Sequence, residues 1–107
     1  DTYFEKQAPF QFVIRNEELK GIQQQDFLLD LDIEGKTVPD EVYVFYNNQK
    51  YKMDKQRISE FTYLFKKLQK DVIFQFLANE YASKEFKIKT IPSPLILNFE
   101  LEIADNI

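Results

Sequence analysis

The sequence contains no cysteine, no histidine and no tryptophan, and it has only two glycines. Without cysteine, the chain cannot form a disulfide scaffold, a thiolate zinc site or a thiol nucleophile. Without histidine, it lacks the commonest general base and the commonest ligand for transition metals, so Ser-His-Asp and Cys-His catalytic sites are excluded. The scarcity of glycine counts mildly against a turn-rich β fold.

Long apolar runs and an excess of basic charge are also missing. No stretch of 18 apolar residues is present, so the sequence predicts no membrane-spanning helix and no direct membrane insertion. The net charge of −4 argues against electrostatic binding to nucleic acid or to an anionic membrane surface. The chain starts at Asp1 and shows no signal peptide, so we interpret it as a segment of a larger protein.

What the sequence does contain is typical of one folded β domain. Its 107 residues are long enough to bury a single core without disulfides. Hydrophobic residues make up 44% of the chain, and aromatic residues make up 16%, with eleven Phe and six Tyr. Phe and Tyr favour the half-buried surface of a pleated sheet.

A period of two is clearest in residues 26–34. The apolar members Phe27, Leu29, Leu31 and Ile33 share one face, and Asp26, Leu28, Asp30, Asp32 and Glu34 share the other. A shorter alternation covers residues 10–14. The β-branched and aromatic run 41–46 is followed by Asn47-Asn48 and then by residues 51–53, which predicts a hairpin because Asn tolerates positive φ.

Residues 56–88 are open to two interpretations. A helical spacing joins Ile58, Phe61, Leu64, Phe65, Leu68 and Val72, with Ser59 as a possible cap. The alternative is three strands near residues 61–65, 72–76 and 86–90, and the β-branched and aromatic residues in each run favour it. With strands here, the chain has about seven, which is typical of a small antiparallel sandwich.

Several segments resemble one protein family. They are DTYFEKQAPFQFVI at 1–14, VPDEVYV at 38–44, FTYLFKKLQKD at 61–71 and PSPLILNF at 92–99. Together they resemble uncharacterised, membrane-anchored envelope proteins of Bacteroidetes, whose extracytoplasmic region is a string of immunoglobulin-like modules. The resemblance covers most of the chain and rests on packing and turn patterns. It implies an extracytoplasmic β-sandwich with neighbouring modules of the same chain as partners, and it implies no activity.

We therefore predict an all-β, immunoglobulin-like antiparallel sandwich. The sequence lacks the Cys pair and the Trp of antibody domains, so the core must be packed by Phe and Leu. The expected core residues are Phe10, Phe12, Leu29, Leu31, Ile33, Val44, Phe61, Tyr63, Phe74, Phe76, Phe86 and Ile88. Because Pro92-Ser93-Pro94 interrupts the last alternation, we expect one module at 1–94, with 95–107 as the first strand of the next module or a linker strand.

Four groups of residues are candidates for a functional site. The acidic residues Asp26, Asp30, Asp32 and Glu34 could suggest calcium, but alternate residues of one strand lie nearly 7 Å apart, so we expect a solvated face with Lys partners on neighbouring strands. The paired carboxylates are interpreted as turn charges, and Lys66-Lys67 and residues 84–89 as edge lysines that discourage aggregation. Those carboxylates are Glu17-Glu18, Asp40-Glu41 and Asp54 with Glu60.

The aromatic group is the remaining candidate. Tyr43, Phe45, Tyr51 and Tyr81 could form an exposed platform, since only one parity of the strand at 41–46 can face the core. The candidate interaction surface is Tyr43, Phe45 and Tyr51. The preferred function is a non-enzymatic structural or protein-interaction module with no catalytic residue, metal or cofactor. The alternative is a glycan- or peptide-binding module, and an enzyme ranks third.

Overall fold

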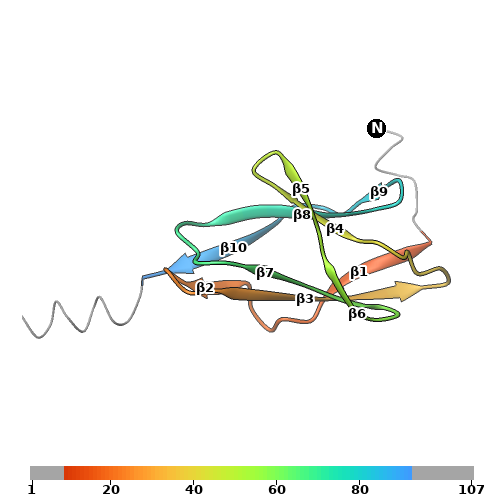
Figure 1. The fold of residues 1–107 in the computed structure, drawn as a ribbon, viewed down its shortest axis with the longest axis horizontal. Coiled ribbons are helices and arrows are strands. Elements are labelled where there is room, and N and C mark those ends of the chain that lie inside the picture. The colour runs from red at the N-terminus through yellow and green to blue at the C-terminus, as the bar shows by residue number, and fades with distance from the viewer. Residues whose placement is uncertain (1–8, 93–107) are drawn as a thin grey trace, which may run out of the picture.

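The computed structural model describes residues 9–92, which form β-strands and no helix (Figure 1). No helix in these residues is therefore long and apolar enough to cross a membrane. The ten strands of this region are β1 (Phe10–Ile14), β2 (Lys20–Ile22), β3 (Phe27–Gly35), β4 (Tyr43–Tyr46), β5 (Gln49–Lys52), β6 (Asp54–Arg57), β7 (Glu60–Phe65), β8 (Val72–Ala78), β9 (Tyr81–Ala82) and β10 (Phe86–Ile91).

The strands form two layers. The four-stranded sheet has the order β1-β3-β7-β6, and the six-stranded sheet has the order β2-β10-β8-β4-β5, with β9 paired to β8. The pairing is antiparallel except between β2 and β10, which run parallel with Lys20 beside Lys89. The two layers lie face to face, so the predicted all-β sandwich is confirmed (Figure 1).

The strand interpretation of residues 56–88 is confirmed, and the helical one is wrong. These residues form β6, β7, β8, β9 and the start of β10. In β7, Phe61 and Phe65 are buried and Leu64 is exposed, as a period of two requires and as the helical pattern does not. Pairing with β3 on one side and β6 on the other therefore decides the backbone conformation.

The described residues contain more strands than the seven expected. The strands that the sequence did not reveal are β2, β6 and β9, with three, four and two residues. Strands this short carry too little alternation to be recognised in the sequence, and each forms because it pairs with a neighbouring strand. All four residues of β6, for example, are exposed, and β6 exists because it pairs with β7.

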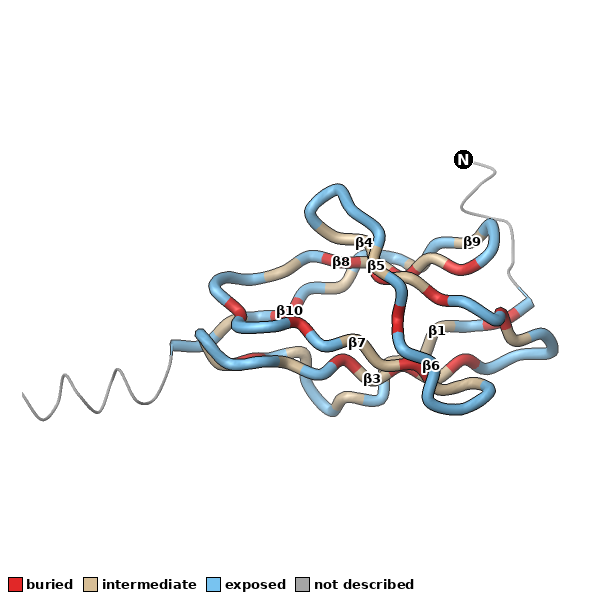
Figure 2. Tube along the Cα trace, in the orientation of Figure 1, coloured by how far each residue is buried: buried red, intermediate tan, exposed pale blue. Residues whose placement is uncertain are grey.

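The core lies between the sheets, where buried segments of both layers meet (Figure 2). Nine of the twelve expected core residues are buried, and Phe12, Tyr63 and Phe86 are half-buried residues packed against them. Phenylalanine rings fill the centre: the Phe12 and Phe76 rings stack at 5.5 Å, and the Phe74 and Phe76 rings meet edge to face at 5.4 Å. The buried apolar residues that the prediction omitted are Val42, Met53, Phe65, Leu68 and Ala78.

Backbone conformation explains the residue types found at two turns. Asn47 and Asn48 have φ of 53° and 61° and connect β4 to β5 in two residues, so the predicted hairpin is confirmed. Gly35 has φ of 147°, a conformation that L side chains rarely adopt, and it lies opposite Phe10 at the end of β3.

The predicted module boundary and the strand expected after it, residues 93–107, lie outside the described residues.

Candidate interaction face

The β4–β5 hairpin separates the three aromatic residues proposed as an interaction surface. Val42 and Val44 are fully buried, so Tyr43 and Phe45 point away from the core, on the outer face of the six-stranded sheet. Tyr51 pairs with Val44 and therefore points to the inner side of the sheet. The structure brings Tyr43 and Phe45 together and places Tyr51 on the opposite face.

Tyr51 belongs instead to an aromatic cluster at the edge of the sandwich. Its ring lies 4.8 Å from that of Tyr46 and 5.9 Å from that of Tyr63, which comes from the other sheet. The Tyr46 and Tyr63 hydroxyls hydrogen-bond to each other at 2.9 Å. Tyr81 also points inward, because its ring packs 5.5 Å from that of Phe10. These tyrosines pack the sandwich and do not extend the outer aromatic surface.

The outer surface of the six-stranded sheet combines an apolar centre with lysines on both sides, and we name it the lysine face. At its centre, β4 and β8 lie side by side, with Tyr43 opposite Leu77 and Phe45 opposite Gln75. Ile73, two residues before Gln75 on β8, is 57% exposed. The lysines of the face are Lys50 and Lys52 on β5, Lys87 and Lys89 on β10, and Lys20 on β2.

A set of polar contacts orders the β5 side of the lysine face. The Tyr43 hydroxyl donates to Glu41 at 2.8 Å, Lys52 lies 3.4 Å from the same carboxylate, and the Lys50 ammonium lies 4.6 Å from the centre of the Tyr43 ring. The Tyr43 hydrogen bond, followed by the Lys52 charge, lowers the pKa of Glu41. The same hydrogen bond raises the pKa of Tyr43. Glu41 is therefore ionised at neutral pH and holds Tyr43 and Lys52 in place.

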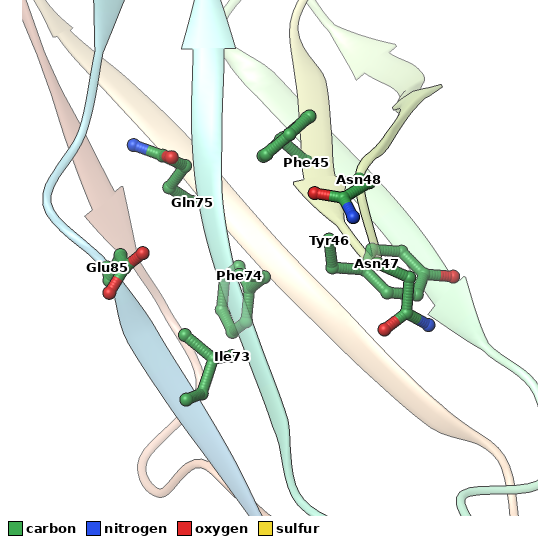
Figure 3. A pocket seen from close by; sticks show the side chains of 8 residues that line it. All are labelled: Phe45, Tyr46, Asn47, Asn48, Ile73, Phe74, Gln75 and Glu85. Carbon is green, nitrogen blue, oxygen red and sulfur yellow. The ribbon is translucent and has the colours of Figure 1, made fainter.

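Two shallow depressions, of about 210 and 200 Å³, lie in this surface. Figure 3 shows the first, where Phe45, Ile73 and Gln75 surround it and Glu85 lies at its rim. The second lies beside Tyr43, Lys50 and Leu77. Both are smaller than the roughly 300–1,000 Å³ of typical small-molecule pockets. A surface of this shape suits a broad, nearly flat partner better than a buried ligand.

The outer surface of the four-stranded sheet has the opposite charge, and we name it the carboxylate face. The expectation of Lys partners for the acidic row is wrong: Asp32 pairs with Val13 and Glu60, and Asp30 pairs with Thr62. The carboxylates of this face are Asp30, Asp32 and Glu34 on β3, Asp54 on β6 and Glu60 on β7. The strand lysines lie on the other sheet, except for Lys55 on β6, which pairs with Asp40.

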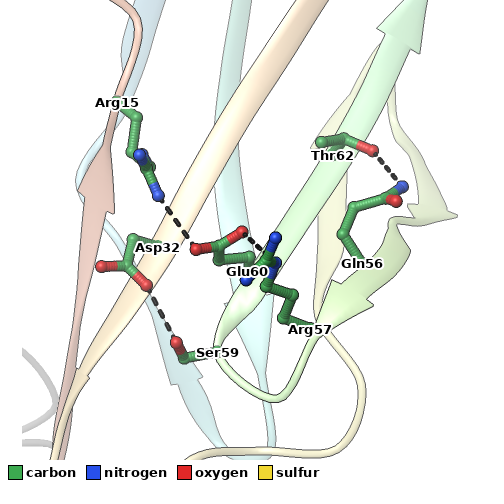
Figure 4. Close-up of polar contacts among 7 residues, drawn as sticks. All are labelled: Arg15, Asp32, Gln56, Arg57, Ser59, Glu60 and Thr62. Atoms are coloured by element: carbon green, nitrogen blue, oxygen red, sulfur yellow. Dashed lines mark hydrogen bonds and ion pairs between the residues drawn. The ribbon is translucent and has the colours of Figure 1, made fainter.

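Arginines and hydroxyls hold the carboxylate face together (Figure 4). Glu60 lies 3.0 Å from Arg15 and 3.6 Å from Arg57. Asp32 accepts a hydrogen bond from the Ser59 hydroxyl at 3.1 Å, while the Ile33 amide donates to the Ser59 carbonyl at 2.8 Å. The β6–β7 turn is thereby fastened to β3.

Asp26 does not belong to the acidic row, although the alternation includes it. It precedes β3, and its carboxylate accepts the backbone N–H of Lys67 at 2.9 Å, where Lys67 has φ of 46°. Asp26 is therefore a turn-stabilising residue that joins the β2–β3 and β7–β8 connections.

The remaining carboxylate pairs lie apart from any enclosed cavity. Glu18 and Asp40 form surface ion pairs with Lys20 at 3.5 Å and Lys55 at 3.8 Å, and Asp54 and Glu60 lie on the carboxylate face. Within residues 9–92, no group of three or more His, Cys, Asp or Glu residues is placed to hold a metal ion. The two lysine runs lie in different places. Lys66 and Lys67 lie in the β7–β8 connection, whereas Lys87 and Lys89 belong to the lysine face.

The sequence contained a signal for the lysine face that the prediction did not use. Lysines alternate with other residues at 50 and 52 and at 87 and 89, with the same parity as the outward positions of β5 and β10. The apolar residue Ile73 has the parity opposite to the buried Phe74 and Phe76. The hairpin places the β5 row beside β4, but the sequence could not provide the pairing that places the β10 row beside β8.

Comparison with known proteins agrees with the sandwich architecture. The fold is similar to a solved structure described as the crystal structure of I81 from titin, at a TM-score of 0.56, with 14% identity over 79% of this chain and 99% of that chain. No protein-family model matches the sequence, and no curated protein matches it either. At this identity the likeness concerns the fold alone.

The strand order follows the immunoglobulin pattern. The sheet β1-β3-β7-β6 corresponds to strands ABED, and β10-β8-β4 corresponds to GFC with β5 added at the edge. The buried positions on strands B, C and F are occupied here by aliphatic and phenylalanine side chains in place of the disulfide and tryptophan of antibodies, as at Leu29, Val44 and Phe76. The described chain is an immunoglobulin-like β-sandwich, a fold typical of structural and interaction modules.

Proposed function

We propose that this chain is a non-enzymatic protein-interaction module of a larger extracytoplasmic envelope protein. The observation that carries the proposal is the lysine face, where the apolar residues Tyr43, Phe45 and Ile73 lie exposed or half-buried between two rows of lysines. Apolar residues gathered on one surface with polar residues around them mark interaction sites. The resemblance to membrane-anchored Bacteroidetes envelope proteins supports the extracytoplasmic part of the proposal.

The path of the chain supports a place in a row of modules. Among the described residues, β1 is the first strand and β10 the last, and the start of β1 and the end of β10 lie toward opposite ends of the long axis (Figure 1). Modules that enter at one end and leave at the other can follow each other in line, with their sheet faces free for partners. A spacer and an interaction surface are therefore compatible roles for the same domain.

A second candidate, peptide binding, is favoured by one observation. In the described residues, β5 pairs with β4 on one side, and no strand pairs with its other side. An extended peptide can add to such an edge through backbone hydrogen bonds. However, Lys50 and Lys52 both stand on this short strand, and lysines on an edge discourage unselective strand addition. We therefore rank the lysine face first.

Photocrosslinking in the native cell tests the interaction face. A photoreactive amino acid replaces Phe45 in the full-length parent protein, and a second variant carries it at Thr37, an exposed loop position away from the lysine face. The proposal expects a discrete protein adduct from position 45 and none from position 37. Equal adducts from both positions, or none from either, would contradict an interaction role for this face.

The location is tested separately with an introduced thiol. Because the chain has no cysteine, a Thr37→Cys variant gives this module one labelling site without background. A membrane-impermeant maleimide should label it in cells whose outer membrane is permeabilised and whose inner membrane is intact. Labelling that appears only after the inner membrane is lysed would place the module in the cytoplasm and overturn this part of the proposal.

A further inference from the structure

The charges of this domain are divided between its two outer surfaces. The charged residues that point outward from the strands of the lysine face are all cations, namely Lys20, Lys50, Lys52, Lys87 and Lys89. Carboxylates in the adjoining connections, Glu18, Glu41 and Asp71, pair with Lys20, Lys52 and Lys87. The strand positions of the carboxylate face carry five acids, and the arginines there, Arg15 and Arg57, are both paired with Glu60. The strands of the two outer surfaces therefore carry charges of opposite sign.

Each face also carries charges that remain available to a partner. In residues 9–92, Lys50 and Lys89 have no ion pair within 4 Å, and neither do Asp30 and Glu34. Lys20, Lys52 and Lys87 have exposed carboxylate partners at 3.4 to 3.5 Å, which exchange readily with other anions. Each face thus has at least two unpaired charges of its own sign.

Both faces repeat their charges at the same interval along a strand, although the distance between their charged strands differs. Charged residues recur at every second position on β5, on β10 and on β3, so each row repeats at about 7 Å along its strand. On the lysine face, the rows on β5 and β10 flank the two central strands. Three strand spacings therefore separate these rows, about 14 Å. On the carboxylate face, β3 and β6 are two spacings apart, about 10 Å, a difference that long lysine side chains can span.

Apolar side chains accompany the charges on both sides. Leu28 and Leu64 stand opposite each other on the carboxylate face and are 52% and 38% exposed. On the lysine face, Ile73 is 57% exposed, beside one of the shallow depressions. Burying such leucines against the apolar centre of the lysine face adds a hydrophobic contribution that the charges alone lack.

We infer that the lysine face of one module binds the carboxylate face of a second copy of the same module. The argument for a copy, and not for an unrelated acidic protein, is that this chain itself carries a surface with strand charges of opposite sign, the same repeat along each strand and exposed leucines. The inference rests on the proposed function, because it names the partner of the same face. A different partner on the lysine face would leave the proposed function standing and would overturn this inference.

Such a contact joins two different surfaces, so it does not close on itself. Each bound copy presents a further lysine face or carboxylate face, and the copies add head to tail into a stack. The contact is largely electrostatic, so it weakens as salt increases, and at about 1 M salt the screening length falls to about 3 Å. The expected behaviour is a concentration-dependent, salt-sensitive association without a fixed stoichiometry.

Two charge-reversal variants of the 107-residue chain test the inference. One carries Lys50→Glu and Lys89→Glu and keeps its carboxylate face. The other carries Asp30→Lys and Glu34→Lys and keeps its lysine face. The matched control carries Lys66→Glu and Lys70→Glu in the β7–β8 connection, outside the strands that form the two faces. Far-UV circular dichroism and thermal melting establish that each variant is folded, and neutral Gln and Asn versions replace any variant that is not.

Sedimentation velocity over a concentration series provides the readout. The wild type and the control should gain mass with concentration in low salt and lose it in about 1 M salt. Each face variant alone should associate at least about tenfold more weakly. An equimolar mixture should associate again, because the intact lysine face of one variant meets the intact carboxylate face of the other, and the two reversed faces also have opposite charge.

Several results would overturn the inference. The first is a wild type that stays monomeric at every concentration in low salt. The second is a mixture of the two variants that stays monomeric while the wild type associates. A control that weakens association as much as the face variants would show that net charge, and not these faces, governs it. If the module is monomeric and position 45 crosslinks to a different protein, the proposed function stands and this inference is wrong.

Discussion

Asp32 on β3 and Glu60 on β7 lie directly opposite each other on the carboxylate face. Two like charges in this position destabilise a sheet unless other groups compensate. Here Arg15 reaches across from the end of β1 to Glu60 at 3.0 Å, and the Ser59 hydroxyl donates to Asp32 at 3.1 Å (Figure 4). The sheet therefore tolerates an acidic pair because its immediate neighbours offset the repulsion.

The first prediction concerns Arg15. An Arg15→Ala variant should lower the free energy of unfolding by about 0.5–1 kcal/mol, the scale of a partly exposed ion pair. In a Glu60→Gln background the same change should cost little, since the like-charge pair is then absent. Urea unfolding of the wild type, both single variants and the double variant measures the coupling. Equal costs in the two backgrounds would show that Arg15 acts independently of Glu60.

The second prediction concerns Gly35. A Cβ atom at this position would collide with the Pro9 carbonyl oxygen and lie 2.5 Å from the Phe10 Cα atom, and the φ of 147° is itself strained for alanine. We expect Gly35→Ala to cost about 2–3 kcal/mol, measured by urea unfolding.

Gly21 provides the matched comparison for that variant. A Cβ atom there would meet the Cδ1 atom of Leu68, which is the end of a side chain and not backbone. Gly21→Ala should therefore recover stability when it is combined with Leu68→Val. No side-chain truncation should rescue Gly35→Ala, because its obstacle is the β1 backbone. A rescue of Gly35→Ala by truncating Phe10 would contradict this explanation.

The third prediction is an acid dependence that arises from Asp71. The backbone N–H of Thr90 donates to the Asp71 carboxylate at 2.7 Å, and this bond, with the Lys87 charge, lowers the pKa of Asp71 below its ordinary value of 3.8. The ionised carboxylate thus favours the folded state at neutral pH, and this stability is lost as the pH falls through the folded pKa. Asp71→Asn should be less stable than the wild type at pH 7, and the difference should shrink below about pH 3.8. A difference that is constant with pH would contradict the assignment.

The fourth prediction is an alkaline dependence that arises from Tyr46. Burial and the hydrogen bond to Tyr63 raise the pKa of Tyr46 above its ordinary value of 10.0. The unfolded chain therefore loses its phenolic proton at a lower pH than the folded chain, and stability falls as the pH rises above 10.0. In Tyr46→Phe this decline should be shallower, as unfolding in urea at a series of alkaline pH values would measure. A decline of the same slope in both proteins would assign it to other groups.

Much of the fold could be predicted because its longest strands carry their own pattern. Alternation in β3 identified the buried Leu29, Leu31 and Ile33, and the Asn47-Asn48 pair identified the hairpin. The two-residue turn also fixes the register of β4 and β5, which places Tyr51 beside Val44. Counting that register along the sequence would have moved Tyr51 to the inner face.

The candidate site could be predicted only in part, because faces are built from strands that are distant in sequence. Tyr43 and Phe45 were recognised from the parity of one strand. Lys50 and Lys52 follow from the hairpin register, whereas Lys87 and Lys89 join the face only because β10 pairs with β8, which no local pattern specifies. The expected Lys partners of Asp30 and Asp32 were wrong for the same reason, since strand order places β3 between β1 and β7.

The parallel pairing of β2 with β10 has a consequence for the order in which the domain folds. It joins Lys20 to Lys89 and so closes a loop that contains nearly all of the described strands. Closing a long loop costs chain entropy before its contacts can compensate, whereas the β4–β5 and β6–β7 hairpins close within a few residues. We therefore expect the hairpins to form early and the β2–β10 pair to form last, so that amide protons in β2 exchange with solvent sooner than those in β3 and β8.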